Sequence, residues 1–318
     1  MLEKIKQLGI VPVIKIDDAE KAVPLAQALC RGGLPCAEIT FRTEAAAESI
    51  KRITDALPDM IVGAGTVLTP EQADKAVAAG AKFVVSPGFN PKVVAHCVDR
   101  AIPIFPGCSN PSDIEQALEF GLNCVKFFPA EQAGGIAAIK AMAAPYGNLS
   151  FLPTGGINAK NLNDYLSFER VVACGGSWMV DSALIDAGDF AAIEELTRTA
   201  VHTMLGFELG HVGINAADDT EAEKTAKPFS DMFGFEYNPG GSSIFLGPYI
   251  EVMKTPYFGA HGHIAIRTNY IERGMAYLSG MGVKFKDGTE KYDAKGKFVA
   301  VYLEGEIGGF AVHLLQKL

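Results

Sequence analysis

Short apolar runs alternate with helical stretches over the first two-thirds of the chain, and this regular alternation limits the possible folds most strongly. The runs are rich in β-branched and aromatic residues, which favour strands, whereas Ala, Glu, Lys and Leu between them favour helices. The predicted strands are 11–16, 36–42, 61–67, 83–87, 102–106, 124–129, 150–154 and 171–177. Eight strand–helix units in about 200 residues predict an α/β fold, a (β/α)8 TIM barrel, with a doubly wound open sheet as the alternative. We prefer the barrel because the repeat is regular and no Gly-rich dinucleotide fingerprint follows the first strand.

The chain of 318 residues is longer than one typical domain, and we expect two domains, at 1–206 and 207–318. With 48% hydrophobic and 20% charged residues, its composition is that of an ordinary globular protein. The net charge of −9 argues against nucleic-acid binding. No apolar run is long enough to cross a membrane, and the amino-terminal residues lack the apolar core of a signal peptide. None of the six cysteines forms a C-x-x-C pair, so neither a zinc cage nor a disulfide framework is indicated. We therefore expect a cytoplasmic protein.

A lysine lies in the middle of the sixth predicted strand, in the stretch Cys-Val-Lys-Phe-Phe-Pro-Ala-Glu at 124–131. Lysine is rarely buried without a partner, because removing an ammonium group from water disfavours its charged form. A neutral Lys126 could attack a ketone and form a Schiff base. The alternatives are a structural ion pair with a carboxylate and a side chain whose ammonium group reaches water.

Polar residues also gather at the predicted carboxyl ends of other strands, where TIM barrels carry their active sites. In the second strand, Glu38, Thr40 and Arg42 are spaced two residues apart, so they share one face, which we expect to line the barrel interior. Gly-Gly pairs at 155–156 and 175–176 lie at the ends of the last two strands, and their backbone amides could bind an anion at the usual phosphate position of this fold. The alternative is that these glycines only permit tight turns.

Six short motifs occur in a fixed order along residues 1–206. They are Glu-Ile-Thr-Phe-Arg-Thr-Glu at 38–44, Val-Gly-Ala-Gly-Thr-Val at 62–67, Ser-Pro-Gly at 86–88, Lys-Phe-Phe-Pro-Ala-Glu at 126–131, Pro-Thr-Gly-Gly-Ile at 153–157 and Gly-Gly-Ser-Trp at 175–178. Together they resemble the class I 2-keto-3-deoxy-6-phosphogluconate (KDPG) aldolases, which often also act on 2-keto-4-hydroxyglutarate (KHG). One departure is Asn110, where a threonine or a similar small hydroxyl residue is expected.

The resemblance implies that Lys126 is the Schiff-base lysine and Glu38 the general acid and base. It implies a pyruvyl pocket formed by Arg42, Thr66, Pro87, Phe128 and Thr154. It also implies that Gly155, Gly156 and Ser177 hold the distal phosphate or carboxylate. We therefore expect a carbon–carbon lyase that cleaves KDPG to pyruvate and glyceraldehyde 3-phosphate, 4-hydroxy-2-oxoglutarate to pyruvate and glyoxylate, or both.

This aldol chemistry needs no cofactor, because a protonated imine on Lys126 is the electron sink. Arg42 would bind the substrate carboxylate and Glu38 would move the protons. The resemblance further implies a homotrimer formed through the barrel. Two alternatives are a small-molecule or metal-binding module whose barrel serves only as a scaffold, and a different phosphosugar enzyme such as an isomerase.

From about residue 207 the pattern changes to an α+β one, because cysteine disappears and strands outnumber helices. Two similar units follow each other. The first has strands at 211–215, 243–246 and 249–254 with a helix at about 220–233, and the second has strands at 263–267, 284–285, 298–303 and 309–315 with a helix at about 271–281. Each unit is a helix crossover with a small antiparallel run, so we expect a smaller α+β domain.

Short motifs in this segment resemble the glyoxalase/dioxygenase superfamily of vicinal oxygen chelate proteins, and this resemblance implies two βαβββ modules. The motifs are Gly-His-Val at 210–212, Met-Phe-Gly-Phe at 232–235, Tyr-Ile-Glu-Val at 249–252, Gly-His-Ile-Ala at 262–265 and Gly-Phe-Ala-Val-His-Leu at 309–314. The resemblance implies a divalent metal held by His211, Glu251, His263 and His313. A histidine at the fourth position departs from the usual glutamate, although imidazole also binds divalent metals. The alternative is a metal-free docking or oligomerisation module.

Overall fold

The structure is a computed structural model that describes residues 1–317. The chain separates into an N-terminal unit, Met1–Met204, and a C-terminal unit that begins at Leu205, two residues before the boundary expected from the sequence. Among the helices of residues 1–317, none combines the length and the apolar character needed to span a bilayer.

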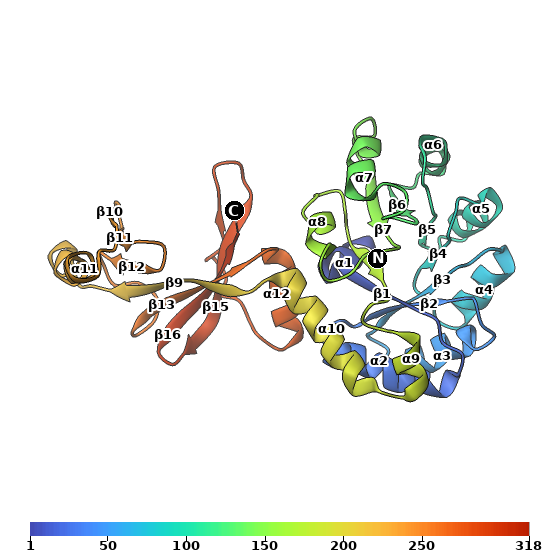
Figure 1. Ribbon diagram of the computed structural model, residues 1–318, viewed down its shortest axis with the longest axis horizontal. Helices are drawn as coiled ribbons and strands as arrows, with labels where there is room; N and C mark the ends of the chain where they lie inside the picture. Colours follow the sequence, from blue (N-terminus) through green and yellow to red (C-terminus); the bar gives the residue numbers. More distant parts are fainter. Residues whose placement is uncertain (318) are drawn as a thin grey trace. The chain divides into compact units, whose positions relative to one another are not determined.

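Parallel strands curl around the centre of the N-terminal unit, with helices outside them (Figure 1, right). The strands are β1 (Ile10–Ile14), β2 (Cys36–Thr40), β3 (Ile61–Gly65), β4 (Val84–Val85), β5 (Ile104–Phe105), β6 (Cys124–Phe127), β7 (Ser150–Pro153) and β8 (Cys174–Gly176). Six of them pair in the order β5-β4-β3-β2-β1-β8, and β6 pairs with β7. Isolated parallel bridges from Gly107 to Lys126 and from Thr154 to Gly175 join these two groups. The unit is therefore an α/β fold with a curled parallel sheet.

Helices alternate with these strands. They are α1 (Leu2–Leu8), α2 (Ala22–Arg31, after the 3-10 turn Ala19–Lys21), α3 (Ala46–Ala56), α4 (Pro70–Ala78), α5 (Pro91–Asp99), α6 (Pro111–Glu119), α7 (Gly135–Ala143), α8 (Leu162–Leu166), α9 (Ser182–Ala187) and α10 (Phe190–Leu205). Proline begins α4, α5 and α6, where a missing amide donor costs no hydrogen bond. Asn110 is the N-cap of α6 and accepts a hydrogen bond from the amide of Asp113 at 3.0 Å. Asparagine caps helices well. Its presence at position 110, where the family resemblance led us to expect a threonine or a similar residue, therefore has a local structural explanation.

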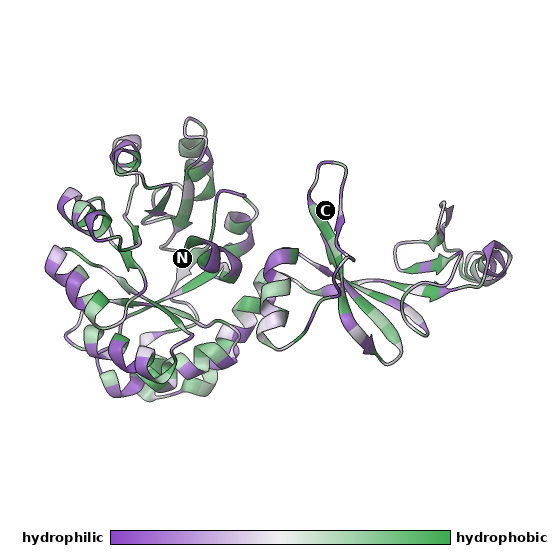
Figure 2. Cartoon of the chain, turned by 180° about the vertical axis from the view of Figure 1, so that it is seen from behind, coloured by the Kyte–Doolittle hydropathy of each residue, from purple (hydrophilic) through white to green (hydrophobic). Residues whose placement is uncertain are grey.

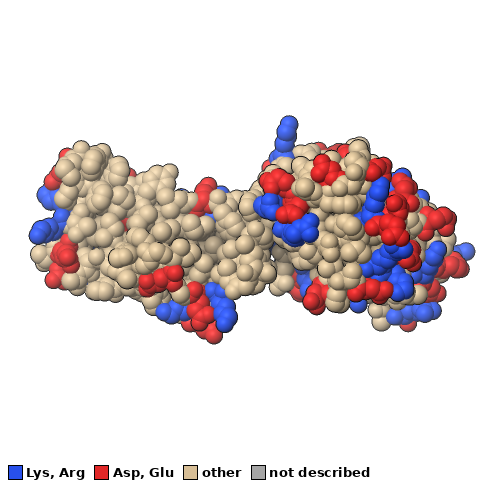
Figure 3. Space-filling model, turned by 90° about the horizontal axis from the view of Figure 1, so that it is seen from below, with Lys and Arg blue, Asp and Glu red and all other residues tan. Residues whose placement is uncertain are grey.

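Apolar side chains fill the interior of the curled sheet. Val11, Cys36, Cys124 and Leu152, from four strands, form one buried cluster with Ile5 of α1. In Figure 2 the strands are hydrophobic, whereas the outer surfaces of the helices carry hydrophilic residues. Acidic and basic side chains are interspersed over the face of this unit seen in Figure 3 (right). All five residues of β2 are buried, so any polar side chain on this strand is held away from water.

One eight-stranded sheet forms the centre of the C-terminal unit (Figure 1, left). Its elements are β9 (Glu208–Asn215), α11 (Asp219–Phe233), β10 (Tyr237–Pro239), β11 (Ser243–Leu246), β12 (Ile250–Met253), β13 (Gly262–Thr268), α12 (Ile271–Gly280), β14 (Lys291–Tyr292), β15 (Phe298–Ile307) and β16 (Phe310–Gln316). The strand order is β10-β11-β12-β9-β13-β16-β15-β14. Two separate apolar clusters stabilise it, one with Ala222 and Ala226 of α11 and one with Ile271 of α12.

The set of strands predicted for this unit needs three corrections. The sequence analysis missed β10 and β14, the two edge strands, and placed a strand at 284–285 where Phe285 makes only an isolated bridge to Leu303. Both missed strands are short, and both residues of β14 are exposed, so they lack the apolar alternation that marks a strand in a sequence. Edge strands are often short and polar, because such a character prevents pairing with other chains.

Candidate active site

The residues predicted to bind the substrate follow the carboxyl ends of strands in the N-terminal unit. Arg42 follows β2, Thr66 follows β3, Pro87 follows β4, Phe128 follows β6, Thr154, Gly155 and Gly156 follow β7, and Ser177 follows β8. The carboxyl ends of parallel strands in a curled sheet lie at the same end of the sheet. The structure therefore brings the predicted binding positions to one end of the unit, while Lys126 and Glu38 lie within β6 and β2.

Lys126 and Glu38 meet inside the curled sheet. Nζ of Lys126 lies 3.6 Å from Oε1 of Glu38, which is longer than a hydrogen bond. The two residues are only 5% and 1% exposed. Within residues 1–317, neither carboxylate oxygen of Glu38 has a hydrogen-bond partner. Buried polar atoms are normally paired, so this carboxylate is placed to interact with a group from outside the chain.

Phe128 and Thr154 border the lysine. Nζ of Lys126 lies 5.3 Å from the centre of the Phe128 ring, within the range of a cation–π contact. The amide of Thr154 donates to the carbonyl of Phe127 at 2.9 Å, which fixes the end of β7 beside the end of β6. Among the described residues, Oγ1 of Thr154 is a second buried atom without a hydrogen-bond partner. The Phe128 ring thus contacts the lysine, and Thr154 lies beside the end of the strand that carries it.

Arg42 lies outside the strand that was expected to contain it. β2 ends at Thr40, and Arg42 occupies the following turn with an exposed side chain. Its Nε donates to Oγ1 of Thr40 at 3.2 Å, and this hydroxyl in turn donates to the carbonyl of Ile14 at 2.8 Å. The expectation of one interior face holds for the buried Glu38 and Thr40 but not for Arg42. The guanidinium remains accessible, so it can meet a carboxylate without the cost of burying an unpaired charge.

Thr66 adopts an unusual backbone conformation. Its φ is 55°, in the left-handed region that β-branched residues rarely occupy. Such a conformation costs about 1–3 kcal/mol and persists where the surroundings enforce it, frequently at functional sites. The conformation fits the predicted role of Thr66 in the pocket.

The loops after β7 and β8 each contain an amide without a hydrogen-bond partner among the described residues, at Gly156 and at Ser177. Gly155 and Gly156 have φ values of 103° and 80°. The bridge between Thr154 and Gly175 directs the amide of Gly155 toward the carbonyl of Gly175, whereas the amides of Gly156 and Ser177 donate no hydrogen bond within the described part of the chain. Gly156 and Ser177 are exposed. Backbone amides of such turns can form a concave site for an anion, and Lys160 near the end of the loop after β7 is the one lysine or arginine in these loop sequences up to α8 and α9.

One polar pair near these loops was missed by the sequence reasoning. Tyr165 on α8 donates a hydrogen bond to Oε1 of Glu131, which lies in the loop after β6. Glu131 is the last residue of the motif that contains Lys126, and this position is the sequence signal that could have identified it as a functional residue. Tyr165 follows 34 residues later and carries no motif of its own.

In the C-terminal unit, four side chains converge on the central strands. His211 comes from β9, Glu251 from β12, His263 from β13 and His313 from β16. Nε2 of His263 lies 3.1 Å from both Nε2 of His211 and Oε2 of Glu251, and Nε2 of His211 lies 3.2 Å from the same carboxylate oxygen. The three histidines offer nitrogen atoms that all lie within 4.8 Å of one another. The structure thus brings all four predicted residues together within one chain.

The electrostatics of this histidine–glutamate cluster keep Glu251 ionised and His313 neutral. Burial tends to raise the pKa of Glu251, but hydrogen bonds with His211, His263 and Ser243 outweigh it and hold the pKa well below its usual range. Burial lowers the pKa of His313 to about 3, and charge on the two other histidines adds to this effect. An ionised carboxylate and a neutral imidazole are the forms that bind metals.

The residues present fit a divalent metal. Within residues 1–317, both ring nitrogens of His313 and Nδ1 of His263 are buried without a hydrogen-bond partner. Gly213 leaves room for the imidazole ring of His263, because a Cβ at position 213 would lie 2.0 Å from Cε1 of that ring. The ring of Tyr302 stacks on that of His313 with 4.7 Å between the ring centres, which restrains its orientation.

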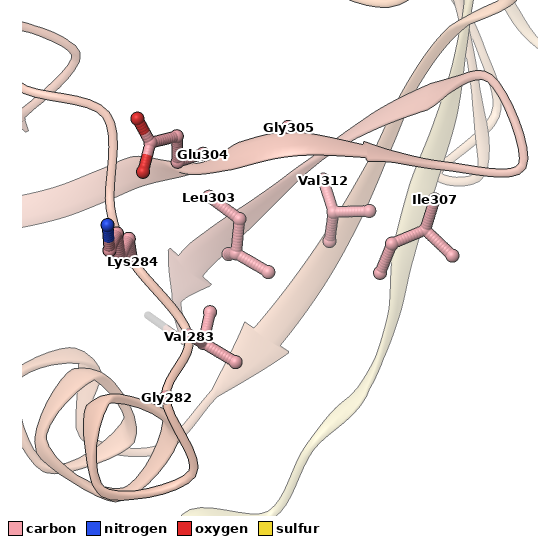
Figure 4. A pocket seen from close by; sticks show the side chains of 8 residues that line it. All are labelled: Gly282, Val283, Lys284, Leu303, Glu304, Gly305, Ile307 and Val312. Carbon is pink, nitrogen blue, oxygen red and sulfur yellow. The ribbon is translucent and has the colours of Figure 1, made fainter.

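A pocket of about 310 Å³ lies elsewhere on the same unit (Figure 4). Val283, Leu303, Ile307 and Val312 supply its apolar lining. Leu303 and Val312 directly neighbour Tyr302 and His313 in their strands, and successive strand residues point to opposite faces. The pocket is therefore separated from the histidine–glutamate cluster by the sheet, and no predicted site residue lines it.

Comparisons with known proteins cover the N-terminal unit. Residues 1–196 match the family model for KDPG and KHG aldolase. The chain is 52% identical over 198 residues to the 2-dehydro-3-deoxy-phosphogluconate aldolase of Treponema pallidum, covering 62% of this chain and 94% of that protein. It is 43% identical over 192 residues to the KHG/KDPG aldolase of Escherichia coli K12, covering 60% of this chain and 90% of that protein.

A solved structure agrees with these sequence matches. The KDPG aldolase of Legionella pneumophila, with pyruvate captured at low pH as a covalent carbinolamine intermediate, is 38% identical, with a TM-score of 0.61. The similarity covers 63% of this chain and 98% of that one. Since the family model matches more than half of the chain and the relatives are matched over nearly their whole length, the chain belongs to the KDPG and KHG aldolase family, and its N-terminal unit is an aldolase, a carbon–carbon lyase.

Proposed function

We propose that Lys126 forms the Schiff base of a class I aldolase and that Glu38 transfers the protons. The observation that carries this proposal is the buried pair itself, 3.6 Å apart, with both carboxylate oxygens of Glu38 unpaired among the described residues. A purely structural ion pair is stable in the interior only when its geometry is close and its oxygens are hydrogen-bonded. The carbinolamine of the Legionella enzyme supports covalent attachment of pyruvate in this family.

The reaction follows from these positions. The amine of Lys126 attacks the C2 ketone to give a carbinolamine, which loses water to form a protonated imine. Glu38 takes the proton of the C4 hydroxyl while the C3–C4 bond breaks. The electron pair of that bond moves into the imine to form an enamine, and the aldehyde leaves. Protonation at C3 and hydrolysis of the imine then release pyruvate and the free amine.

The substrate proposed for this site is KDPG, cleaved to pyruvate and glyceraldehyde 3-phosphate. The backbone amides of Gly155 and Gly156, with Ser177, would bind its phosphate, and the accessible guanidinium of Arg42 would bind the C1 carboxylate in bidentate fashion. The pyruvyl part would lie among Thr66, Pro87, Phe128 and Thr154. The names of the relatives support 4-hydroxy-2-oxoglutarate, cleaved to pyruvate and glyoxylate, as a second substrate.

Pyruvate release by the purified full chain tests this assignment. We expect release from both substrates by the wild type and from neither by Lys126→Arg, which keeps the positive charge but cannot form an imine at neutral pH. Equal rates for the two proteins, or an isomerised sugar acid as the product, would contradict the aldolase assignment. The ratio of the two wild-type rates identifies the preferred substrate.

We also propose that the N-terminal unit forms a homotrimer, as its resemblance to the aldolases implies. Light scattering on the purified chain is the test, and a mass equal to one chain would contradict the proposal.

For the C-terminal unit we propose a glyoxalase-like domain of two βαβββ modules, β9 to β12 and β13 to β16. In each segment a strand and a helix precede three further strands. The sheet order places β12, β9, β13 and β16 side by side at its centre. These are the four strands that carry the histidine–glutamate cluster, so each module contributes two of the four side chains.

We propose that His211, Glu251, His263 and His313 hold one divalent metal. Three imidazoles and one carboxylate suit zinc, nickel or iron better than magnesium or calcium, which prefer oxygen ligands. When bound, such a metal would supply Lewis-acid chemistry that the aldol reaction does not use. The alternative is a metal-free docking module.

Metal analysis of protein purified without chelators tests this second proposal. We expect close to one equivalent of zinc, nickel or iron per chain, lost in the double variant His211→Ala, His263→Ala. Less than about a tenth of an equivalent, together with no rise in thermal stability on adding zinc or nickel, would leave only a structural role, since a bound ligand must stabilise the folded state.

A further inference from the structure

The loop after β6 is hydrogen-bonded to the loop that carries Gly155 and Gly156. The amide of Ala130 donates to the carbonyl of Thr154 at 2.8 Å, and the amide of Glu131 donates to the carbonyl of Gly155 at 3.1 Å. The first loop begins two residues after Lys126. The placement of the two glycines therefore depends on the segment that follows the reactive lysine.

The side chain of Glu131 extends this contact. A Cβ built on Gly156 would lie 2.5 Å from Cγ and 2.6 Å from Cβ of Glu131. No residue other than glycine fits here, and its φ of 80° adds a second reason. The aliphatic stem of Glu131 thus lies directly against the backbone of Gly156, whose amide has no hydrogen-bond partner among the described residues.

Tyr165 fixes the orientation of Glu131. The tyrosine is 1% exposed, and its phenol donates to Oε1 of Glu131. Burial raises the pKa of Tyr165 and the hydrogen bond to Glu131 raises it further, so the phenol remains a donor at any ordinary pH. An exposed glutamate without such a partner would sample several rotamers. A rigid, buried donor therefore restrains a side chain that is otherwise in solvent.

We infer that Tyr165 and Glu131 are positioning residues that determine specificity for the phosphorylated substrate. Tyr165 holds Glu131 against Gly156, and this keeps the amides of the Gly155–Gly156 loop in their anion-binding arrangement. The inference rests on the anion-binding role proposed above for these glycines. The role of Glu131 is geometric, because its negative charge would oppose the binding of a phosphate.

Steady-state kinetics of the full chain on KDPG and on 4-hydroxy-2-oxoglutarate test this inference. Tyr165→Phe should raise KM for KDPG about fivefold, the effect of losing one hydrogen bond, with little change in kcat or in KM for the shorter substrate. Glu131→Ala should behave in the same way. Glu131→Gln should keep the wild-type KM, because its amide oxygen still accepts from the phenol. The matched control is Tyr146→Phe, which removes a tyrosine–glutamate hydrogen bond to Glu115 elsewhere in this unit and should change neither constant.

Two results would overturn the inference. One is an equal loss on both substrates in Tyr165→Phe, which would indicate a general structural role. The other is an unchanged KM for KDPG in both Tyr165→Phe and Glu131→Ala.

The Ser177→Ala variant distinguishes failure of the positioning role from failure of the proposed phosphate binding. If it raises KM for KDPG while Tyr165→Phe does not, only the positioning role is wrong. If neither variant changes KM, the loops do not bind the phosphate, and the positioning role falls with that assignment. Should Tyr165→Phe fold poorly, the Glu131→Ala and Glu131→Gln pair gives the same decision.

Discussion

The two units hold their polar clusters in different ways. In the N-terminal unit, Lys126 and Glu38 lie within strands of a curled parallel sheet, and the proposed binding residues follow the strand ends. In the C-terminal unit, His211, Glu251, His263 and His313 project from the central strands of one open sheet. Both clusters contain buried atoms without hydrogen-bond partners among residues 1–317.

The side chains of each cluster indicate which kind of added group, a substrate or a metal ion, the cluster would bind. An amine beside an unpaired carboxylate is suited to a covalent imine, which is formed from the substrate itself. Imidazoles beside an ionised carboxylate cannot form an imine, but they are suited to binding a metal. The comparison therefore predicts that the aldol reaction depends on one lysine, whereas the second cluster depends on an added ion. The predictions below test this separation.

The largest expected effect is on Lys126. Lys126→Arg should lower kcat/KM for both substrates by about 10⁴-fold or more, the scale on which removal of a covalent nucleophile acts. Coupled assay of pyruvate release measures it. Metal content should stay at the wild-type level in this variant, and a joint loss of both would show that the two units are not independent.

Glu38→Gln should have the next largest effect. It keeps the shape of the side chain but cannot accept a proton, so kcat should fall by about 10²–10⁴-fold, the usual contribution of a general acid or base. Single-turnover cleavage rates of the wild type and the variant provide the measurement. A variant that retains more than half of the wild-type kcat would assign the proton transfers to another group.

Ser177→Ala should have a smaller effect that depends on the substrate. Loss of one charge-assisted hydrogen bond costs about 1.5–3 kcal/mol, which is roughly tenfold to a hundredfold in kcat/KM. The loss should appear with KDPG and be much smaller with 4-hydroxy-2-oxoglutarate. Equal losses on the two substrates, measured by the same pyruvate assay, would count against phosphate binding by this loop.

The smallest expected effect on catalysis is that of metal removal. Treatment with EDTA should leave the rate of aldol cleavage unchanged, because the imine is the electron sink. The same treatment should lower the thermal stability of the C-terminal unit, because a metal that binds only the folded state stabilises it. Calorimetry of treated and zinc-reloaded protein measures this difference. A fall in the cleavage rate that zinc restores would contradict the separation of the two sites.

The predictions for the N-terminal site come largely from signals that are local in the sequence. Lys126 stands out as a charge within an apolar strand, and Gly155 and Gly156 follow β7, whereas Gly175 and Gly176 lie within β8 and pair with β1. The exposed position of Arg42 was not predictable, because the alternation of residues continues past Thr40 although the strand ends there. Tyr165 was missed for a different reason. Its partner Glu131 lies 34 residues away, and only the fold brings them together.

Less of the C-terminal unit could be predicted from its sequence. Its four converging side chains were found through short motifs, and strand pairing then explained how distant residues meet. The edge strands β10 and β14 gave no hydrophobic pattern. The apolar pocket beside Leu303 was also missed, because a cavity depends on how the β15–β16 hairpin and the chain at 282–284 pack, which periodicity does not describe.

Covalent trapping tests the central claim most directly. The full chain is incubated with pyruvate, reduced with borohydride and analysed by peptide mass spectrometry. We expect a reduced three-carbon adduct on Lys126 and on no other lysine, with none on the Lys126→Arg protein. The absence of any adduct on the wild type, or an adduct on Lys140 or Lys160 instead, would contradict the account.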